Sequence, residues 1–348
     1  MKKRSVINLI KYYSEKNDSA FRNEAENIAR DFDREGDSEI ASYIVSLLSD
    51  VNVFVPQMGD SVSALFERID INNDNLWLPD EIMENLKGII NAVTYHKGIN
   101  KFLFYGMPGT GKTEAVKQVA RILNRELFMV NFSGVVDSKL GNTGKNIVEL
   151  FREINNFSKP ERLIILFDEI DALALDRTNR QDHREMGRAT SGLLKELDRL
   201  RPEIVLIATT NLFDSFDKAL IRRFDALVDF DKYSERDLYE ICEKFLDKYL
   251  KEFHLTKRDL RLFKKIYENK EGYFSPGEIK NQIRSSIAFS DPNIEGDYLR
   301  RIYSFFCNDS PDDVFELKKQ GFTVREISVL TGKSKSTVDR ELKERINR

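Results

Sequence analysis

The sequence predicts an α/β protein with a doubly wound parallel sheet, followed by a helical lid and flanked by a helical unit at each end. Two observations lead to this fold class. Short apolar segments alternate with helical stretches between residues 102 and 230, and some of them, such as LIILF, are apolar throughout, as in strands covered on both faces. After residue 233 the strand pattern stops, and the remaining chain has the spacing of amphipathic helices.

The bulk composition indicates several domains and excludes two classes of protein. The 348 residues carry a net charge of -3, with 32% charged residues, which excludes a uniformly basic nucleic-acid-coating protein. The longest apolar runs, 163–167 and 204–208, are far shorter than the roughly 20 residues that span a bilayer. The first residues lack the apolar core of a signal peptide, so we expect a cytoplasmic protein without a membrane partner.

Residues 1–70 are predicted to form a small helical domain. Their apolar residues, among them Ile28 and Phe32, recur at helix-like spacing in the better stretches. Asp60 and Ser61 are suited to capping a further short helix over 62–69, and the polar residues 72–75 are typical of a linker. We therefore place the first domain boundary near residue 71.

Residues 71–232 are predicted to form the α/β domain, 233–308 the helical lid and 309–348 a second compact helical unit. The expected strands of the α/β domain are 102–105, 127–132, 163–167, 204–209 and 227–230. In the lid, helical periodicity predicts four helices, 236–250, 260–267, 276–288 and 298–306.

A glycine-rich segment follows the first strand and leads into a helix. The residues Gly106, Met107, Pro108, Gly109, Thr110, Gly111, Lys112 and Thr113 fit the pattern GxxxxGK(S/T) in the strand–loop–helix context that a phosphate-binding loop requires. Its backbone amides and the helix N-terminus suit the phosphates of ATP, with Lys112 reaching the β- and γ-phosphates. Thr113 would offer its hydroxyl to Mg²⁺. The alternative to a phosphate-binding loop is a glycine-rich turn that contains a lysine by chance.

Carboxylates follow the buried strand 163–167, where packing gives no reason for them. Open α/β sheets bind ligands at the carboxyl ends of their strands. We expect Asp168 to hold Mg²⁺ and Glu169 to polarise the attacking water. Asp171 has two open interpretations, a role at a subunit boundary or a helix cap. Asn211 ends the next strand; alone it would be a turn former, but there it is placed to orient the same water.

The segments GMPGTGKT, LIILFDEID, LIATTN and FDKALIRRFD together resemble the AAA ATPase family over about residues 71–308. The resemblance implies the P-loop NTPase fold, ATP and Mg²⁺ as cofactors, and a ring of copies of the chain, commonly six. Arg222 and Arg223 fall on the family's trans-acting arginine region. This chain lacks the Pro-Gly of the commoner RPGRFD spelling, so the choice between the two arginines stays open.

Two further segments are similar to family elements. The lid segment 274–281 is similar to the family's SGADI-type segment, which closes over the base and ribose; no arginine stands at the usual second-sensor position, and Arg284 follows later. The segment 133–141 aligns with the central-pore loop, where Lys139 replaces the gripping aromatic beside Leu140. The missing aromatic weakens the interpretation of the chain as a strong threading unfoldase. The alternative to a pore loop is an ordinary surface loop.

The C-terminal segment 317–342 resembles the helix-turn-helix of resolvases and bacterial regulators. Thr323 and Glu326 form a capping-box pair, Gly332 makes the turn, and Ser334 caps the next helix, around an expected core of Val324, Ile327, Leu330, Val338 and Leu342. Residues 317–348 contain nine basic and four acidic residues. The second helix would present Lys335, Ser336, Thr337 and Arg340 to duplex DNA. Protein docking and a structural tail are the alternatives.

The cysteines and histidines indicate no zinc site. Cys242 and Cys307 lie in apolar surroundings without CxxC spacing, which favours buried reduced thiols, and the three histidines are scattered. The leading hypothesis is an Mg²⁺-dependent, ring-forming ATPase that remodels an unidentified protein or protein–DNA assembly. Its architecture is similar to that of ATPases of bacterial accessory or phage-defence systems. The alternative is an ATP-switched DNA-binding regulator with slow turnover.

Overall fold

The computed structural model describes residues 65–71, 76–135, 142–173, 182–255 and 258–346, with residues 8, 11–12, 24–25 and 27–32 near the N-terminus. The chain divides into two compact units, Met1–Ser61 and Val62–Arg348. In the first unit the described residues are helical, and Ala25, Ile28 and Ala29 are buried. The helical N-terminal domain as a whole stays a prediction.

The second unit contains a six-stranded sheet with the strand order β1-β3-β4-β5-β2-β6. Strands β2 to β6 are parallel, and β1 forms one edge of the sheet, where it pairs with β3 in the antiparallel direction. The strands are β1 (Phe66–Ile69), β2 (Lys101–Tyr105), β3 (Glu126–Val130), β4 (Leu163–Phe167), β5 (Val205–Thr210) and β6 (Ala226–Asp229). The five predicted strands are confirmed, and with them the mainly parallel sheet.

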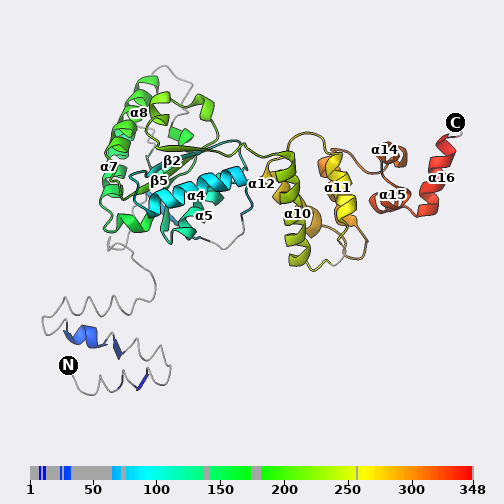
Figure 1. Ribbon diagram of the computed structural model, residues 1–348, viewed down its shortest axis with the longest axis horizontal. Helices are drawn as coiled ribbons and strands as arrows, with labels where there is room; N and C mark the ends of the chain where they lie inside the picture. Colours follow the sequence, from blue (N-terminus) through cyan, green and yellow to red (C-terminus); the bar gives the residue numbers. More distant parts are fainter. Residues whose placement is uncertain are drawn as a thin grey trace. The chain divides into compact units, whose positions relative to one another are not determined.

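Helices cover both faces of this sheet (Figure 1). Along β4 the buried side chains alternate: Ile164 and Leu166 pack in the core shared with α4 and α5, whereas Ile165 and Phe167 pack in the core shared with α7 and α8. The main helices are α4 (Asp80–Thr94), α5 (Lys112–Ile122), α7 (Asn142–Asn155) and α8 (Asp182–Asp198), with the short α6 (Phe132–Val135) and α9 (Lys218–Ile221). The continuous apolar strand therefore results from two cores, one on each side.

The helix predicted over 62–69 is wrong for residues 66–69, which form β1. Phe66 is buried and packs edge-on against Phe157, with ring centroids 5.7 Å apart. Arg68 is exposed and pairs with Glu126 on β3 at 3.1 Å. Four residues are too few to distinguish the two periodicities, and pairing with β3 determines the outcome. The sheet thus includes residues that precede the predicted boundary at 71, and the predicted linker 72–75 lies outside the described residues.

The four predicted lid helices are confirmed. They are α10 (Glu235–Glu252), α11 (Leu260–Glu268), α12 (Pro276–Ala288) and α13 (Asp297–Phe306). Two of them begin with a capping box, Ser234 with Asp237 on α10 and Ser275 with Glu278 on α12. Because α12 starts at this cap, its first turn has a fixed position, and that turn faces the glycine-rich loop.

Three helices follow the lid: α14 (Val314–Lys319), α15 (Val324–Thr331) and α16 (Lys335–Ile346). The predicted caps are present. Thr323 and Glu326 form the capping box of α15, Gly332 ends it with a φ of 69°, and the Ser334 hydroxyl accepts a hydrogen bond from Thr337 N at 3.2 Å. The predicted core residues Ile327, Leu330, Val338 and Leu342 are buried, and Val324 is partly buried beside them.

The lid and the three C-terminal helices share one apolar core. At their junction, Tyr303 of α13 donates a hydrogen bond to Gln320 at 2.8 Å, and its ring lies 6.0 Å from that of Phe322. Lys265 of α11 pairs with the buried Glu326 of α15 at 2.7 Å. The C-terminal helices are thus joined to the lid by apolar packing, a hydrogen bond and an ion pair.

Both cysteines are buried and free, as predicted, and burial raises the pKa of the Cys307 thiol to about 12. The Cys242 thiol also has a raised pKa, for the same reason. These thiols are therefore protonated core groups. Within the described ranges, no helix has both the length and the apolar character needed to cross a membrane.

Candidate nucleotide site

The glycine-rich loop lies between β2 and the N-terminus of α5, as predicted. Gly106, Gly109 and Gly111 have positive φ angles of 141°, 78° and 94°. A Cβ on Gly106 would lie 2.8 Å from Oδ1 of Asp231, and that same oxygen accepts a hydrogen bond from Met107 N at 2.6 Å. Only glycine allows this close approach, so the loop conformation requires the sequence pattern that predicted it.

Lys112 is buried at the base of the loop. Its ammonium group donates to the carbonyl oxygens of Gly106 at 2.7 Å and Met107 at 2.8 Å. Burial lowers the pKa of Lys112, while the nearby carboxylates of Asp231 and Asp168 oppose this shift. An anionic phosphate is a stronger acceptor than a carbonyl. The geometry thus allows a phosphate to replace the loop carbonyls as the acceptor for this ammonium group.

Asp168 lies at the centre of a set of short hydrogen bonds. It accepts from the Thr113 hydroxyl at 3.0 Å and from the Thr209 hydroxyl at 2.6 Å. A hydroxyl and a carboxylate are hard oxygen ligands of the kind that Mg²⁺ takes, usually with waters and substrate phosphates completing the shell. In the part of the chain that the structure describes, no cluster of three acidic, histidine or cysteine residues forms a metal cage. The residues fit a magnesium ion that is bound together with phosphates.

Glu169 and Asn211 come together at the carboxyl ends of β4 and β5. Nδ2 of Asn211 lies 3.5 Å from Oε1 of Glu169, at the limit of a hydrogen bond. Glu169 has a φ of 49°, in the left-handed region that residues other than glycine seldom adopt. Asp171 lies inside a short 3-10 helix, and among the described residues its buried Oδ1 has no hydrogen-bond partner.

The two candidate arginines differ in their surroundings. The Arg223 guanidinium donates to Ala219 O at 2.9 Å and pairs with Asp198 of α8 at 3.3 Å. Arg222 is exposed, and within the described ranges its side chain makes no hydrogen bond or ion pair. The structure thus ties Arg223 to its own domain and leaves Arg222 directed to solvent.

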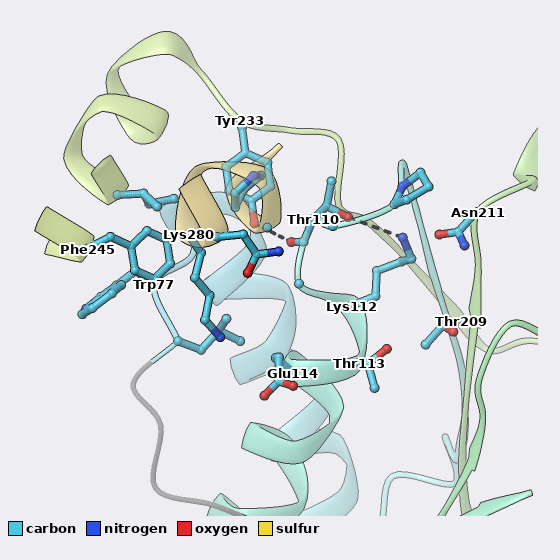
Figure 2. A pocket seen from close by; sticks show the side chains of 18 of the residues that line it. Trp77, Thr110, Lys112, Thr113, Glu114, Thr209, Asn211, Tyr233, Phe245 and Lys280 are labelled. Carbon is cyan, nitrogen blue, oxygen red and sulfur yellow. Dashed lines mark hydrogen bonds between the residues drawn. The ribbon is translucent and has the colours of Figure 1, made fainter. Parts of the chain in front are cut away.

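A cavity of 370 Å³ joins these elements (Figure 2). Figure 2 shows Lys112, Thr113, Thr209 and Asn211 toward one end and Trp77, Tyr233 and Phe245 toward the other. Its walls come from the segment before α4, the loop, the ends of β4 and β5, and the lid helices α10 and α12. The remaining lining residues are Leu76, Pro108, Gly109, Thr110, Gly111, Glu114, Asp168, Glu169, Ile241, Lys248, Pro276, Gly277, Lys280 and Asn281.

The aromatic end of the cavity was missed by sequence reasoning. Trp77 contacts Phe245 of α10 edge-on, with ring centroids 5.1 Å apart. The hydroxyl of Tyr233 donates to Thr110 O at 2.7 Å, and burial raises the pKa of Tyr233, so the phenol stays protonated. Trp77 is the only tryptophan in the sequence, which was the one available signal for its role.

The lid touches the loop directly through α12. Gly277 N donates to Gly109 O at 2.8 Å, and a Cβ on Gly277 would lie 3.0 Å from that same oxygen. From the predicted segment 274–281, Pro276, Gly277, Lys280 and Asn281 line the cavity. Arg284 is exposed and is absent from the lining. Two lid lysines line the cavity instead, Lys248 of α10 and Lys280 of α12.

The remaining predicted residues lie elsewhere. Lys139 and Leu140 of the predicted pore loop lie outside the described residues. On α16, Lys335, Ser336 and Arg340 are exposed and Thr337 is half-buried. Intrahelical and neighbouring carboxylates approach the basic groups of this region: Glu344 lies 3.9 Å from Arg340 and Glu341 lies 2.7 Å from Lys333.

Known proteins resemble this chain over its central part. The model of the family "ATPase family associated with various cellular activities (AAA)" matches residues 102–232. An uncharacterized AAA family ATPase of Sinorhizobium fredii is 39% identical over 133 residues, which are 38% of this chain and 39% of the relative. The proteasome-activating nucleotidase of Methanococcus vannielii is 35% identical over 176 residues, 49% of this chain and 42% of that protein. The chain thus spans less than half the length of these relatives.

Two further comparisons extend the picture. The peroxisomal ATPase pex6 of Schizosaccharomyces pombe is 32% identical over 182 residues, 50% of this chain and 18% of the relative. A chain in the solved structure of the E. coli MS115-1 HORMA:CdnC:Trip13 complex shares the fold, with a TM-score of 0.56 and 15% identity over 70% of this chain and 94% of that one. Together with the loop, Asp168 and the lid-covered cavity, the family match identifies residues 102–232 as an AAA family ATPase domain.

Proposed function

We propose that this protein hydrolyses ATP with Mg²⁺ and uses the cycle to remodel a protein or protein–DNA assembly. The observation that carries the proposal is the convergence of Lys112, Thr113, Asp168, Glu169 and Asn211 on one cavity that the lid also lines. Phosphate ligands, metal ligands and a candidate base thus meet at the carboxyl edge of the sheet, where α/β proteins bind nucleotides.

Each residue then has a physical role. Lys112 binds the β- and γ-phosphates, and Thr113 with Asp168 holds the metal, which neutralises phosphate charge when bound. Glu169 accepts a proton from the attacking water, and Asn211, 3.5 Å from its carboxylate, orients that water. Trp77 and Phe245 provide the apolar surface for the base, while Tyr233 fixes the loop through Thr110.

The proposed active form is a ring of copies of this chain, of the six-membered kind that the family resemblance implies. The cavity is lined by lysines from the loop and from the lid, and no arginine among the described residues lines it. Arg222 is exposed and directed to solvent. An arginine from a neighbouring copy would supply the remaining positive charge to the γ-phosphate in the transition state.

The names of the relatives support a protein client. One relative is a proteasome-activating nucleotidase, another is a peroxisomal ATPase, and the solved relative belongs to a complex with HORMA and CdnC partners. Lys139 and Leu140 are the proposed client contacts in the pore. We extend the proposal to a role in a bacterial accessory or defence system, and recovery of the client from the native cell tests this step.

The experiment that tests the ATPase proposal measures phosphate release by the full chain with ATP and Mg²⁺, alongside its mass by size-exclusion chromatography with light scattering. We expect the unmodified chain to release phosphate and Lys112→Ala to lose this activity. The rate per subunit should rise with protein concentration as the ring assembles. Absence of turnover from the assembled ring at saturating ATP would overturn the proposal.

A second candidate function is an ATP-switched regulator that binds duplex DNA through α16. Exposed Lys335, Ser336 and Arg340 favour it, whereas the paired carboxylates on the same helix reduce its net charge. Binding through these residues must weaken steeply with salt, because phosphate contacts release counterions. A mobility-shift titration of the unmodified chain at low and high salt tests it, and no shift at low salt would favour protein docking instead.

A further inference from the structure

A single hydroxyl on β5 connects the two adjacent acidic residues of the site. Oγ1 of Thr209 donates a hydrogen bond to Oδ1 of Asp168 at 2.6 Å and accepts one from the backbone N–H of Glu169 at 2.9 Å. The side chain is 1% exposed, so water does not compete for these bonds.

The sheet register places this hydroxyl beside the end of β4. Phe167 on β4 pairs with Ala208 on β5, so Thr209 lies at the next level, where β4 has ended and Asp168 begins. At this position a hydroxyl can donate and accept at once, which neither an apolar side chain nor a cation can do. A β-branched residue also suits the strand itself.

The two bonds hold different parts of the site. The first orients the Asp168 carboxylate, which also accepts from Thr113 at 3.0 Å. The second holds the amide of Glu169 while that residue adopts a φ of 49°, and this backbone conformation directs the Glu169 carboxylate toward Asn211. A left-handed residue other than glycine persists only where its surroundings determine it.

We propose that Thr209 is a positioning residue for ATP hydrolysis, which sets the metal-binding carboxylate and the catalytic carboxylate in register with each other. It acts through Asp168 and Glu169, its two hydrogen-bond partners. The inference rests on the proposed ATPase function and adds a residue to it.

The test compares Thr209→Val, which keeps the shape and removes the hydroxyl, with Thr209→Ser, which keeps the hydroxyl. We expect Thr209→Val to lower kcat by at least about tenfold, with a change in KM below about threefold, because binding of the base is unaffected. Thr209→Ser should restore kcat to within about threefold of the unmodified chain. The melting temperature of each variant shows whether it is folded.

A second measurement does not depend on turnover. In the Glu169→Gln background, the Mg²⁺ concentration that half-saturates binding of a fluorescent ATP analogue should rise when Thr209 becomes Val and return when it becomes Ser. Thr331→Val is the matched control, since the buried Thr331 hydroxyl also donates one bond and accepts one, to Ile327 O at 2.8 Å and from Lys333 N at 3.2 Å, far from the site.

An unchanged kcat in Thr209→Val, or a Ser variant as impaired as the Val variant, would overturn the proposal. If the unmodified chain itself shows no turnover, the ATPase function fails, and the Mg²⁺ titration alone decides about Thr209. A raised half-saturation concentration then supports its positioning of Asp168, and an unchanged concentration refutes it.

Discussion

The Thr113 hydroxyl donates to the Asp168 carboxylate over 3.0 Å, although 55 positions separate the two residues. Thr113 lies in the first turn of α5, and Asp168 directly follows β4, which lies two positions from β2 in the sheet. A metal ion held between them would place the bound phosphates close to the residues proposed for acid–base chemistry. The following predictions test this arrangement and the elements around it.

Replacing Glu169 by Gln should preserve ATP binding and lower turnover by about 100-fold or more, because the amide cannot accept the proton of the attacking water. Phosphate release and binding of radiolabelled ATP measure the two effects separately. Glu268→Gln, which changes an exposed lid carboxylate, is the control. A Glu169→Gln variant with normal turnover would remove Glu169 from its role.

Arg222→Ala should lower turnover by about 100-fold or more, as expected for a trans-acting arginine, with little change in melting temperature. Arg223→Ala, in contrast, should destabilise the domain by roughly 0.5–1 kcal/mol, since Arg223 bonds Ala219 and Asp198 at the surface. Thermal unfolding beside the ATPase assay separates the two arginines.

Mixing two inactive variants tests whether Arg222 acts between subunits. In a randomly mixed ring of Arg222→Ala and Glu169→Gln copies, about a quarter of the interfaces combine an intact Glu169 with an intact Arg222. Activity should therefore reappear on mixing, after subunit exchange. A mixture as inactive as its components would argue for action within one subunit.

Trp77→Ala should weaken ATP binding by roughly 5- to 100-fold, the range expected for losing one aromatic surface under a base, and leave kcat nearly unchanged. Trp77→Phe should recover most of the affinity. Because the chain has one tryptophan, its intrinsic fluorescence in the unmodified protein should also change when ATP is added. A kcat effect without an affinity effect would contradict a role at the base.

Glu326→Ala should destabilise the lid and C-terminal helices by about 1–3 kcal/mol, because it removes a capping box and leaves Lys265 without its partner. Glu326→Gln keeps the cap and isolates the charge. Burial of Glu326 opposes ionisation, but its bonds with Lys265 and Thr323 prevail and lower its pKa below the ordinary 4.5.

The sign of the pH effect follows from this lowered pKa. The ion pair contributes fully above pH 4.5 and is lost as the pH falls through the lowered pKa of the folded state. The difference in melting temperature between the unmodified chain and Glu326→Gln should therefore shrink on acidification. Glu316→Gln, which changes an α14 carboxylate that pairs with the exposed Lys319 at the surface, should show no such trend.

The sequence predicts the parts of this protein whose signals are local. The strand 163–167 can be predicted because both of its faces are covered, which makes it apolar throughout. The loop 106–113 can be predicted because its backbone conformation requires glycine at fixed positions. Residues 66–69 were assigned wrongly because the pairing partner of so short a strand is distant in the sequence. The periodicity of four residues could not reveal it.

The aromatic end of the cavity could not be predicted for a different reason. Trp77 and Phe245 are 168 positions apart in the sequence and meet only through the tertiary packing of the segment before α4 against α10. The family resemblance implies an arginine as the second sensor and gives no role to Lys280, and a threonine inside an apolar strand, such as Thr209, has only the sequence signal of a β-former. Tertiary position, which sequence spacing does not encode, gives these side chains their roles.

The core common to the lid and the last three helices also determines how the chain tolerates shortening. Removal of residues after 308 would leave the Tyr303 ring without Phe322 and its hydroxyl without Gln320. The uncovered apolar side of α13 would loosen α12, whose first turn bonds the loop through Gly277 and Gly109. A chain shortened in this way would thus lose ATP binding because its lid would no longer pack stably against the loop, whatever the last helices recognise.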